Sequence, residues 1–265
     1  MLTYLMTRDV IRVSYKSSNY AHYRLTDPEL VKKALTIAEQ MEIEPEQALT
    51  IPEDFFDIIV GFQDIKDTII KSLKAERPVH ILLIGPPATG AKTLFMDDIR
   101  RLPGARYTLG STDTKAGITR FLMDYRPRIL MVDEMDKMTR EDYSALLSLM
   151  ETGIVTEMKF HRTQTVQLKC WVFGAANDVE RIPAELKSRF LVFHVKPYGE
   201  ADFIRVVTNA LQKREGVNEQ LASYIAKQLA SKTKDPRVAV KIARLCKTEE
   251  EVLTMIRMMM EYRSL

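Results

Sequence analysis

Short apolar runs alternate with amphipathic stretches along the middle of the chain. The apolar runs lie at 80–84, 129–132, 171–175 and 191–195. Apolar residues recur at helical spacing in the stretches at about 62–75, 92–101, 114–124 and 141–151. Strands that are apolar on both faces and alternate with amphipathic helices are typical of a parallel sheet covered on both sides. The pattern therefore predicts an α/β domain over residues 51–196.

The pattern changes after this domain. From Phe203 to Met260 the apolar residues recur only at helical spacing. This predicts a small all-helical domain over residues 197–265, and we expect the segment 196–199 (Lys-Pro-Tyr-Gly) to be the hinge before it.

The pattern is also different before the α/β domain. Residues 1–50 are expected to form an extension with one strand at 10–15 and a loop rich in Ser, Asn and Tyr. A helix should follow, because Thr26-Asp27-Pro28 combines an N-cap residue with proline in the first turn.

Composition narrows the class of protein. The 265 residues are 46% hydrophobic and 28% charged, which is ordinary for a globular protein, and the net charge is only +3, so a site for a polyanion would have to be a local patch. Cys170 and Cys246 are far apart, with no Cys/His cluster, which indicates a reducing compartment. No apolar stretch has membrane-spanning length, and the N-terminal apolar segment is too short for a signal peptide. We therefore expect a cytoplasmic protein that does not enter a membrane.

A glycine-rich segment follows the first apolar run and precedes a predicted helix. It reads Gly85-Pro86-Pro87-Ala88-Thr89-Gly90-Ala91-Lys92-Thr93. A strand, a glycine-rich turn and a helix N-terminus together present backbone N–H groups to an anion. In the phosphate-binding loop the lysine directly follows the second glycine, but here Ala91 intervenes.

Two placements of this longer loop are open. In the first, which we favour, Lys92 binds phosphate and Thr93 binds Mg²⁺, and the extra residue bulges out near Thr89-Gly90. In the second, residues 85–90 keep the usual register and Lys92 points away from the phosphates. That arrangement would give weak nucleotide binding or no turnover.

Two further apolar runs end in polar residues. The run at 129–132 ends in Asp133-Glu134, which is either a strand that ends in solvated acids or a metal ligand followed by a general base. The run at 171–175 leads to Asn177, which is either a turn residue or an amide that contacts phosphate or water. Their position after a glycine-rich loop favours the functional interpretation of both, with Asp133 in the Mg²⁺ shell and Glu134 polarising the attacking water.

The order of these motifs resembles that of the AAA+ ATPases over about residues 53–247. The segment 85–93 resembles Walker A, 129–134 resembles Walker B, and Asn177 resembles the sensor-1 residue. The segment 185–190 (Glu-Leu-Lys-Ser-Arg-Phe) is similar to the box that ends in the arginine finger. The resemblance implies that Arg189 reaches into the nucleotide site of the neighbouring subunit.

Two more segments belong to the resemblance. The segment 235–239 (Asp-Pro-Arg-Val-Ala) resembles sensor 2, where Arg237 would contact the γ-phosphate, and 56–61 is similar to the segment that packs on adenine. The catalytic residues would be Glu134, Asn177 and Arg189, with Thr93 and Asp133 at Mg²⁺. The expected ATP contacts are Val60, Gly61, Gly85, Pro86, Pro87, Gly90, Ala91, Lys92, Thr93, Leu94, Asp133 and Arg237.

The residues before the sensor-1 strand alternate between apolar and polar, which predicts a β-hairpin at about 152–169. A hairpin in this place resembles the insertion of the RuvB branch-migration motors and the MCM helicases, where it implies contact with DNA. The tip offers Lys159, Phe160, His161 and Arg162, which are cations and rings suited to phosphates and bases. The alternative is a plain structural hairpin with a solvated tip.

The sequence is compatible with three functions. The first is a Mg²⁺-dependent ATPase that assembles into a homo-oligomeric ring, by resemblance a hexamer, and that translocates on DNA or remodels DNA-bound complexes. The second is a nucleotide-gated binding module with little turnover, which the lengthened loop favours. The third is an AAA+ ATPase that acts on a protein partner.

Overall fold

The computed structural model of the chain describes residues 2–18, 20–33, 49–87, 90–111, 114–159 and 162–262. The chain divides into two compact units, residues 1–48 and residues 49–265. Each unit is described by itself. Within the described residues, no helix combines the length and the apolar character that crossing a bilayer requires.

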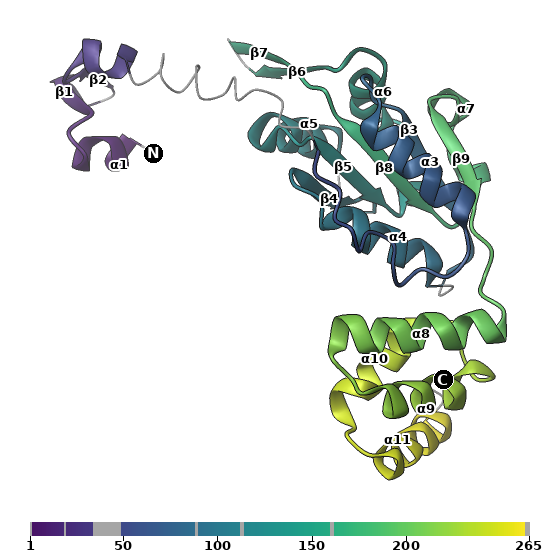
Figure 1. Cartoon of the computed structure of the whole chain (residues 1–265). Coiled ribbons are helices and arrows are strands. Elements are labelled where there is room, and N and C mark those ends of the chain that lie inside the picture. Colours follow the sequence, from purple (N-terminus) through teal and green to yellow (C-terminus); the bar gives the residue numbers. More distant parts are fainter. Residues whose placement is uncertain are drawn as a thin grey trace. The chain divides into compact units, whose positions relative to one another are not determined.

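A five-stranded sheet forms the centre of the larger unit (Figure 1). All its strands are parallel, in the order β4-β5-β8-β3-β9. Their bounds are β3 His80–Ile84, β4 Ala105–Leu109, β5 Ile129–Asp133, β8 Trp171–Ala176 and β9 Phe190–His194. The predicted α/β fold with a parallel sheet is confirmed. Strand β4 was not predicted, and it is the strand at one edge of the sheet.

Helices cover both faces of this sheet because its strands are apolar on both sides. Alternate strand residues such as Ile81 and Leu83 pack in one core with α3 and α4, whereas Leu82 and Ile84 pack in a second core with α5 and α6. The helix bounds are α3 Gln63–Lys74, α4 Ala91–Arg100, α5 Lys115–Tyr125, α6 Tyr143–Thr152 and α7 Ala184–Lys187.

Four helices follow the sheet and complete the helical C-terminal region that the sequence predicts. They are α8 Glu200–Glu215, α9 Glu219–Ala230, α10 Pro236–Leu245 and α11 Glu249–Glu261. Their apolar stripes belong to the same core cluster as α3 and α4. We call these four helices the lid.

A buried carboxylate, that of Asp98 on α4, joins the lid to the sheet domain. It is 2% exposed and accepts hydrogen bonds from Phe56 N at 3.1 Å, Arg101 Nη1 at 3.0 Å and Arg214 Nη2 at 2.8 Å. Burial raises the pKa of Asp98, and the two guanidinium groups oppose that shift. Because Arg214 lies on α8, this ion pair fixes the lid against the helix that follows the glycine-rich loop.

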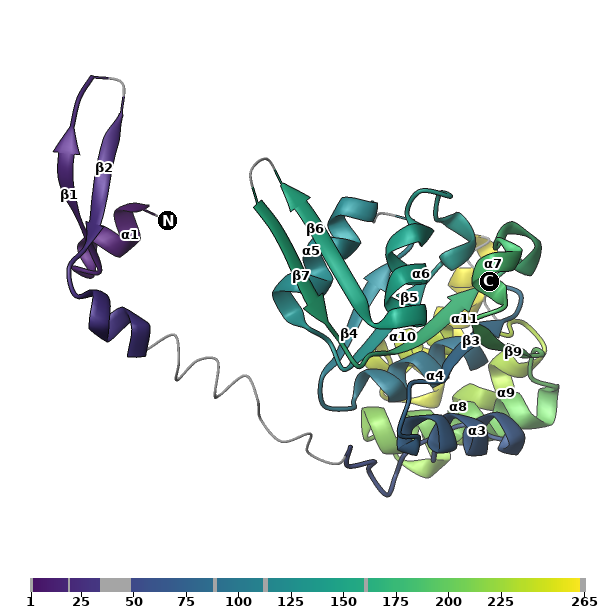
Figure 2. The ribbon, with the colours of Figure 1, turned by 90° about the horizontal axis from the view of Figure 1, so that it is seen from above.

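The segment between α6 and β8 forms an antiparallel pair of strands, β6 (Ile154–Lys159) and β7 (Arg162–Gln167). Ile154 pairs with Gln167 at the base, and Lys159 pairs with Arg162 at the tip. Strand β6 lies beside α5 (Figure 2). Phe160 and His161, between the strands, lie outside the described residues.

The smaller unit contains helix α1 (Leu2–Thr7), followed by the antiparallel strands β1 (Ile11–Lys16) and β2 (Ala21–Leu25). The expectation of a loop at 21–25 is wrong, because this segment is a strand that pairs with β1. Residues 28–33 are helical, and the rest of the helix expected there lies outside the described residues.

Candidate nucleotide-binding site

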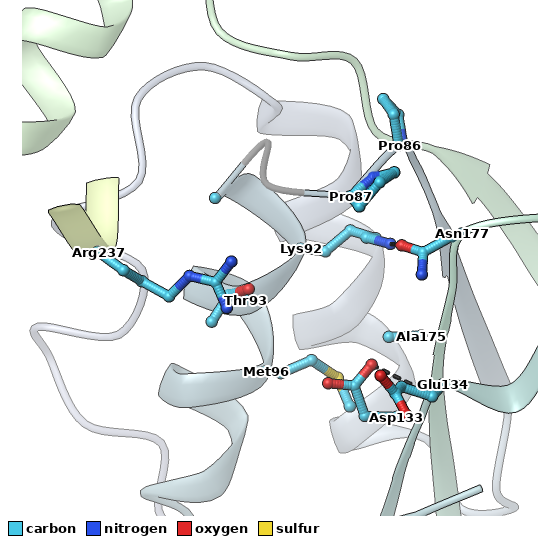
Figure 3. Close-up of a pocket in the computed structure, with 11 residues that line it drawn as sticks. Pro86, Pro87, Lys92, Thr93, Met96, Asp133, Glu134, Ala175, Asn177 and Arg237 are labelled. Carbon is cyan, nitrogen blue, oxygen red and sulfur yellow. Dashed lines mark hydrogen bonds between the residues drawn. The ribbon is translucent and has the colours of Figure 1, made fainter. Parts of the chain in front are cut away.

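A pocket of about 170 Å³ lies at the carboxyl ends of β3, β5 and β8 (Figure 3). In open parallel sheets, ligands bind beyond this edge, where neighbouring strands connect in different directions. The lining residues come from the glycine-rich loop, α4, β5, β8 and the lid. They are Pro86, Pro87, Gly90, Lys92, Thr93, Met96, Asp133, Glu134, Ala175, Asn177 and Arg237.

Lys92 lies in this pocket, one residue after the start of α4. Its ammonium group donates to Gly85 O at 2.7 Å, Ala176 O at 2.8 Å and Asn177 Oδ1 at 2.6 Å. Burial lowers the pKa of Lys92, and the nearby carboxylates of Asp133 and Asp136 partly offset this. The cation therefore ties the start of the loop to the end of β8, at the place where an anion would enter.

The loop that bears Lys92 is packed too closely for side chains at two glycines. Gly90 has φ +72°, and a Cβ there would lie 2.1 Å from Pro236 Cδ of the lid. A Cβ on Gly85 would lie 2.5 Å from Val195 O. Glycine is therefore required where the lid and the last strand approach the loop. Ala88 and Thr89 lie outside the described residues.

Asp133 ends β5 and faces the pocket. Its Oδ1 accepts from Glu134 N at 2.7 Å, and its Oδ2 accepts from the Tyr107 hydroxyl at 3.2 Å. Burial first, and then the charge of Asp133, raise the pKa of Tyr107 to about 12. Tyr107 thus remains a neutral donor that orients the carboxylate. Tyr107 was not predicted as part of the site because β4 was not predicted, since Arg106 interrupts its apolar pattern.

Glu134 follows in a left-handed backbone conformation with φ 54°, which is uncommon for a residue other than glycine. Its Oε1 accepts a hydrogen bond from Lys137 Nζ at 2.6 Å. This bond, with a smaller contribution from Ser111, lowers the pKa of Glu134. The carboxylate is therefore ionised at neutral pH. Lys137, three residues further on, is a partner that the sequence analysis did not identify.

Asn177 is held from two sides. Its backbone N–H donates to Asp136 Oδ1 at 3.1 Å, and its side-chain oxygen accepts from Lys92. Asp136 is 9% exposed and lies in the turn after Glu134. The segments after β5 and β8 are therefore linked directly, which fixes the amide beside the two acids.

Arg237 brings a second cation to the pocket from the lid. It lies in the first turn of α10, whose N-cap Asp235 accepts from both the Arg237 backbone N–H and its guanidinium, with Nη2 to Oδ2 at 2.8 Å. This hydrogen bonding raises the pKa of Arg237. The Arg237 side chain is 58% exposed, so it is accessible to an incoming anion.

Some predicted residues do not line this pocket. Gly85 contributes its carbonyl group to Lys92, and Ala91 is buried in α4. Leu94 lines a neighbouring cavity of about 440 Å³ together with Ile58 and Arg237. Val60 and Gly61 line neither cavity.

Arg189 also lies outside the pocket. Its Nη2 pairs with Glu151 Oε2 at 2.8 Å, and its Nη1 donates to Glu185 O at 2.8 Å. The structure therefore does not bring Arg189 together with Lys92 and Asp133 in the same chain. Of the hairpin tip, only the backbone of Lys159 and Arg162 is described.

Two lining residues, Met96 and Ala175, were not predicted. Met96 lies one helical turn after Lys92 on α4, so helical spacing alone could have identified it. Ala175 is the next-to-last residue of β8 and offers only its small side chain and backbone.

The residues present fit a nucleoside triphosphate with Mg²⁺. Lys92 and Arg237 supply two cations for phosphate oxygens, and α4 begins at the pocket. Thr93 and Asp133 supply a hydroxyl and a carboxylate, the hard oxygen ligands that Mg²⁺ takes together with phosphate oxygens. The adjoining cavity beside Ile58 and Leu94 offers apolar side chains for a base.

Comparisons with known proteins point to one family. Residues 81–198 match the family described as "ATPase family associated with various cellular activities (AAA)". The chain is 26% identical over 217 residues to the Holliday junction branch migration complex subunit RuvB of Ehrlichia canis, covering 76% of this chain and 65% of that protein. It is 26% identical over 168 residues to the DNA replication licensing factor mcm5-B of Xenopus laevis, covering 53% of this chain and 23% of that protein.

Solved structures agree on the fold. The RuvB Holliday junction branch migration motor of Thermotoga maritima matches with a TM-score of 0.56 at 19% identity, covering 79% of this chain and 72% of that one. The chain spans less than two thirds of the length of the two curated relatives named above. The chain therefore carries an AAA-family domain at residues 81–198 and is similar to RuvB and MCM proteins.

Proposed function

We propose that this chain is a Mg²⁺-dependent ATPase that works as a ring of identical copies on DNA. The observation that carries the proposal is the convergence of Lys92, Asp133, Glu134, Asn177 and Arg237 on one pocket. These residues come from four separate parts of the chain. Phosphoryl transfer needs cations for the phosphates, oxygen ligands for the metal and a group that positions water, and this set supplies all three.

Each residue has a distinct task in the proposal. Lys92 and Arg237 bind phosphate oxygens, while Thr93 and Asp133 would hold Mg²⁺, which supplies charge neutralisation on the phosphates when bound. Glu134 orients the attacking water and accepts its proton, since its carboxylate is ionised. Asn177 positions that water or a γ-phosphate oxygen.

Lys92 is the reason to keep a second candidate function. All three of its N–H donors are already used by Gly85 O, Ala176 O and Asn177 Oδ1. Glu134 is likewise engaged by Lys137. Phosphates must therefore displace existing hydrogen bonds, which favours slow turnover. A nucleotide-gated binding module with little hydrolysis is the function that follows if this displacement is incomplete.

The proposed ring follows from the position of Arg189. This guanidinium does not reach the pocket of its own chain, so a transition-state cation from Arg189 must come from a neighbouring copy. Six copies are proposed from the resemblance to AAA+ ATPases. The ion pair with Glu151 would hold Arg189 until the neighbour binds.

DNA is proposed as the polymer because of the β6–β7 hairpin and the named relatives. The hairpin tip carries Lys159 and Arg162, and the relatives are a branch migration subunit and a replication licensing factor. A protein substrate is the alternative for the same motor. It would be favoured if neutralising the two tip cations left salt-dependent DNA binding unchanged.

Mixing two inactive variants tests the proposal sharply. Arg189→Ala should bind ATP and hydrolyse none, and Glu134→Gln should behave likewise. In a mixture, Glu134→Gln copies supply Arg189 to the intact acids of Arg189→Ala copies, so hydrolysis should return. An Arg189→Ala variant with the wild-type rate, or a mixture that stays inactive, would overturn the shared site.

Steady-state hydrolysis with and without DNA, across protein concentration, tests the rest. A specific activity that rises steeply with concentration supports assembly, and stimulation by DNA supports the DNA motor. Nucleotide binding with no hydrolysis under any of these conditions would instead establish the binding module.

A further inference from the structure

We propose that one face of the N-terminal hairpin β1–β2 is a binding site for single-stranded nucleic acid. The proposal deepens the proposed function, because it adds a second contact to the polymer. It stands on a different part of the chain and its test needs no ATP hydrolysis.

The strand pairing sorts the side chains of this hairpin onto two faces. Arg12 pairs with Arg24, and Tyr15 pairs with His22. His22 and Arg24 are two residues apart on one strand and so share a face. Arg12 and Tyr15 are three apart, but the register shifts between Val13 and Tyr15, as in a β-bulge, which brings Tyr15 to the same face.

This face carries rings at one end and cations at the other. Tyr15, Tyr20 and His22 form a cluster with ring centroids 5.6–5.9 Å apart. The two tyrosines are 55% and 59% exposed, although rings that stabilise a fold are usually buried. Arg12 and Arg24 are exposed next to them. We call these five residues the ring–arginine face.

The two arginines are the strongest sign of a polyanionic ligand. Like charges directly opposite each other on a two-stranded ladder destabilise the pair. Within the described part of the chain neither guanidinium has an ion-pair partner, and neither strand contains an Asp or Glu. A row of phosphates would neutralise both cations at once.

The exposed aromatic rings favour a single-stranded nucleic acid over other polyanions. Exposed aromatic rings beside cations bind unpaired bases by stacking, whereas a duplex keeps its bases stacked on one another. An acidic peptide would satisfy the arginines but would leave the three rings without matching surfaces. On the opposite face, Lys16 pairs with Ala21 and is the one cation, beside Val13, Tyr23 and Leu25. The paired arginines and the cluster of rings therefore coincide on one side only.

The test measures binding of a fluorescently labelled oligothymidylate to the full-length chain by anisotropy, without nucleotide. Tyr15→Ala/Tyr20→Ala should weaken binding about tenfold or more, since stacking on each ring contributes to affinity. Arg12→Gln/Arg24→Gln should weaken binding and lower the slope of log affinity against log salt by about 1.4, because each phosphate that an arginine neutralises adds about 0.7 to that slope.

Control variants separate a binding role from a folding role. Arg12→Glu places a carboxylate opposite Arg24, which should stabilise the hairpin and still weaken binding. Tyr23→Ala, on the opposite face, and Arg205→Gln, on α8, should bind like the wild type. Circular dichroism of each variant checks that the fold is retained.

Three results would overturn the proposal. The first is an unchanged affinity for oligothymidylate in both double variants. The second is a loss of affinity in Tyr23→Ala and Arg205→Gln as large as in the double variants. The third is that unlabelled duplex DNA displaces the labelled oligothymidylate as well as unlabelled single strand does. ATP hydrolysis in the absence of nucleic acid should be the same in all these variants. Face-dependent binding by a chain that hydrolyses no ATP would therefore uphold this site while rejecting the proposed function.

Discussion

Lys92 Nζ donates a hydrogen bond to Asn177 Oδ1 at 2.6 Å, which joins the first turn of α4 to the residue that follows β8. The same ammonium group also binds the carbonyl oxygens of Gly85 and Ala176. The phosphate-binding candidate and the sensor-1 candidate are thus one hydrogen-bonded unit. A ligand that accepts a hydrogen bond from Lys92 must therefore displace Asn177 Oδ1 or one of these two carbonyl oxygens.

This unit predicts different effects on ATP binding for two substitutions of Asn177. Asn177→Ala should leave ATP affinity within a few-fold of the wild type, because Lys92 is freed, and should lower the hydrolysis rate about 100-fold, as loss of one positioned polar group does. Asn177→Asp should weaken ATP binding, because a carboxylate holds Lys92 and repels phosphate. Equilibrium binding of a labelled ATP analogue and phosphate release check both. Unchanged hydrolysis in Asn177→Ala would remove this residue from the site.

The contact between Gly90 and Pro236 predicts that the loop and the lid are coupled. Gly90→Ala should weaken ATP binding, because its Cβ would overlap Pro236 Cδ, and should cost about 1–2 kcal/mol for the left-handed backbone. Pro236→Ala in the same chain should restore part of the affinity. Gly216→Ala is the matched control, with φ +66° and no atom within 4 Å of the added Cβ. It should lower stability while leaving ATP affinity alone.

The buried acceptor Asp98 predicts unequal costs for two lid arginines. Arg214→Ala should lower the free energy of unfolding by about 2–3 kcal/mol, because it removes a partner of a buried carboxylate. Arg244→Ala breaks an ion pair with Glu215 whose arginine is 67% exposed, and should cost about 0.5 kcal/mol. Urea denaturation of both variants gives the comparison. Equal costs would show that Asp98 does not hold the lid.

His80 predicts loss of stability in mild acid. It is 5% exposed, its Nδ1 accepts from Val172 N at 3.0 Å, and its Nε2 faces Met150 O at 3.3 Å. Burial lowers the pKa of His80 below its usual value. The unfolded chain therefore binds a proton that the folded chain does not. The contribution of His80 to the free energy of unfolding is fully present above the unfolded pKa of about 6.5. As the pH drops below that value, the contribution decreases by up to about 1.4 kcal/mol per pH unit.

His80→Asn tests the cause of that acid sensitivity. Asparagine keeps an acceptor for Val172 N but does not titrate. Urea midpoints measured between about pH 7 and pH 5.5 should fall less steeply for the variant than for the wild type. Equal slopes would assign the acid sensitivity to another group.

The strands that were predicted well are those whose sequence is apolar without interruption. The runs at 80–84 and 129–132 became β3 and β5 with bounds that differ by one residue at most. Strands β4 and β2 were missed because Arg106 and Arg24 interrupt them. Strand β4 lies at the edge of its sheet, and β2 belongs to a two-stranded ribbon. Such strands tolerate charged side chains, so their apolar pattern is weak.

The sequence indicated most of the residues that line the pocket, but not the hydrogen bonds between them. Motif order placed Lys92, Asp133 and Arg237 on one pocket, but no local pattern indicates that Tyr107 orients Asp133 or that Lys137 engages Glu134. Such contacts depend on which strands become neighbours and on side-chain conformation, which the order of motifs does not specify.

Phosphate release by the wild type beside Glu134→Gln tests the central claim most directly. The two are measured with ATP and Mg²⁺ at a protein concentration where the chain assembles, and ATP binding is measured in parallel. The account predicts hydrolysis by the wild type, a rate lower by about 100-fold or more in Glu134→Gln, and similar ATP affinity in both. Equal rates in the two proteins, whether near zero or not, would contradict it.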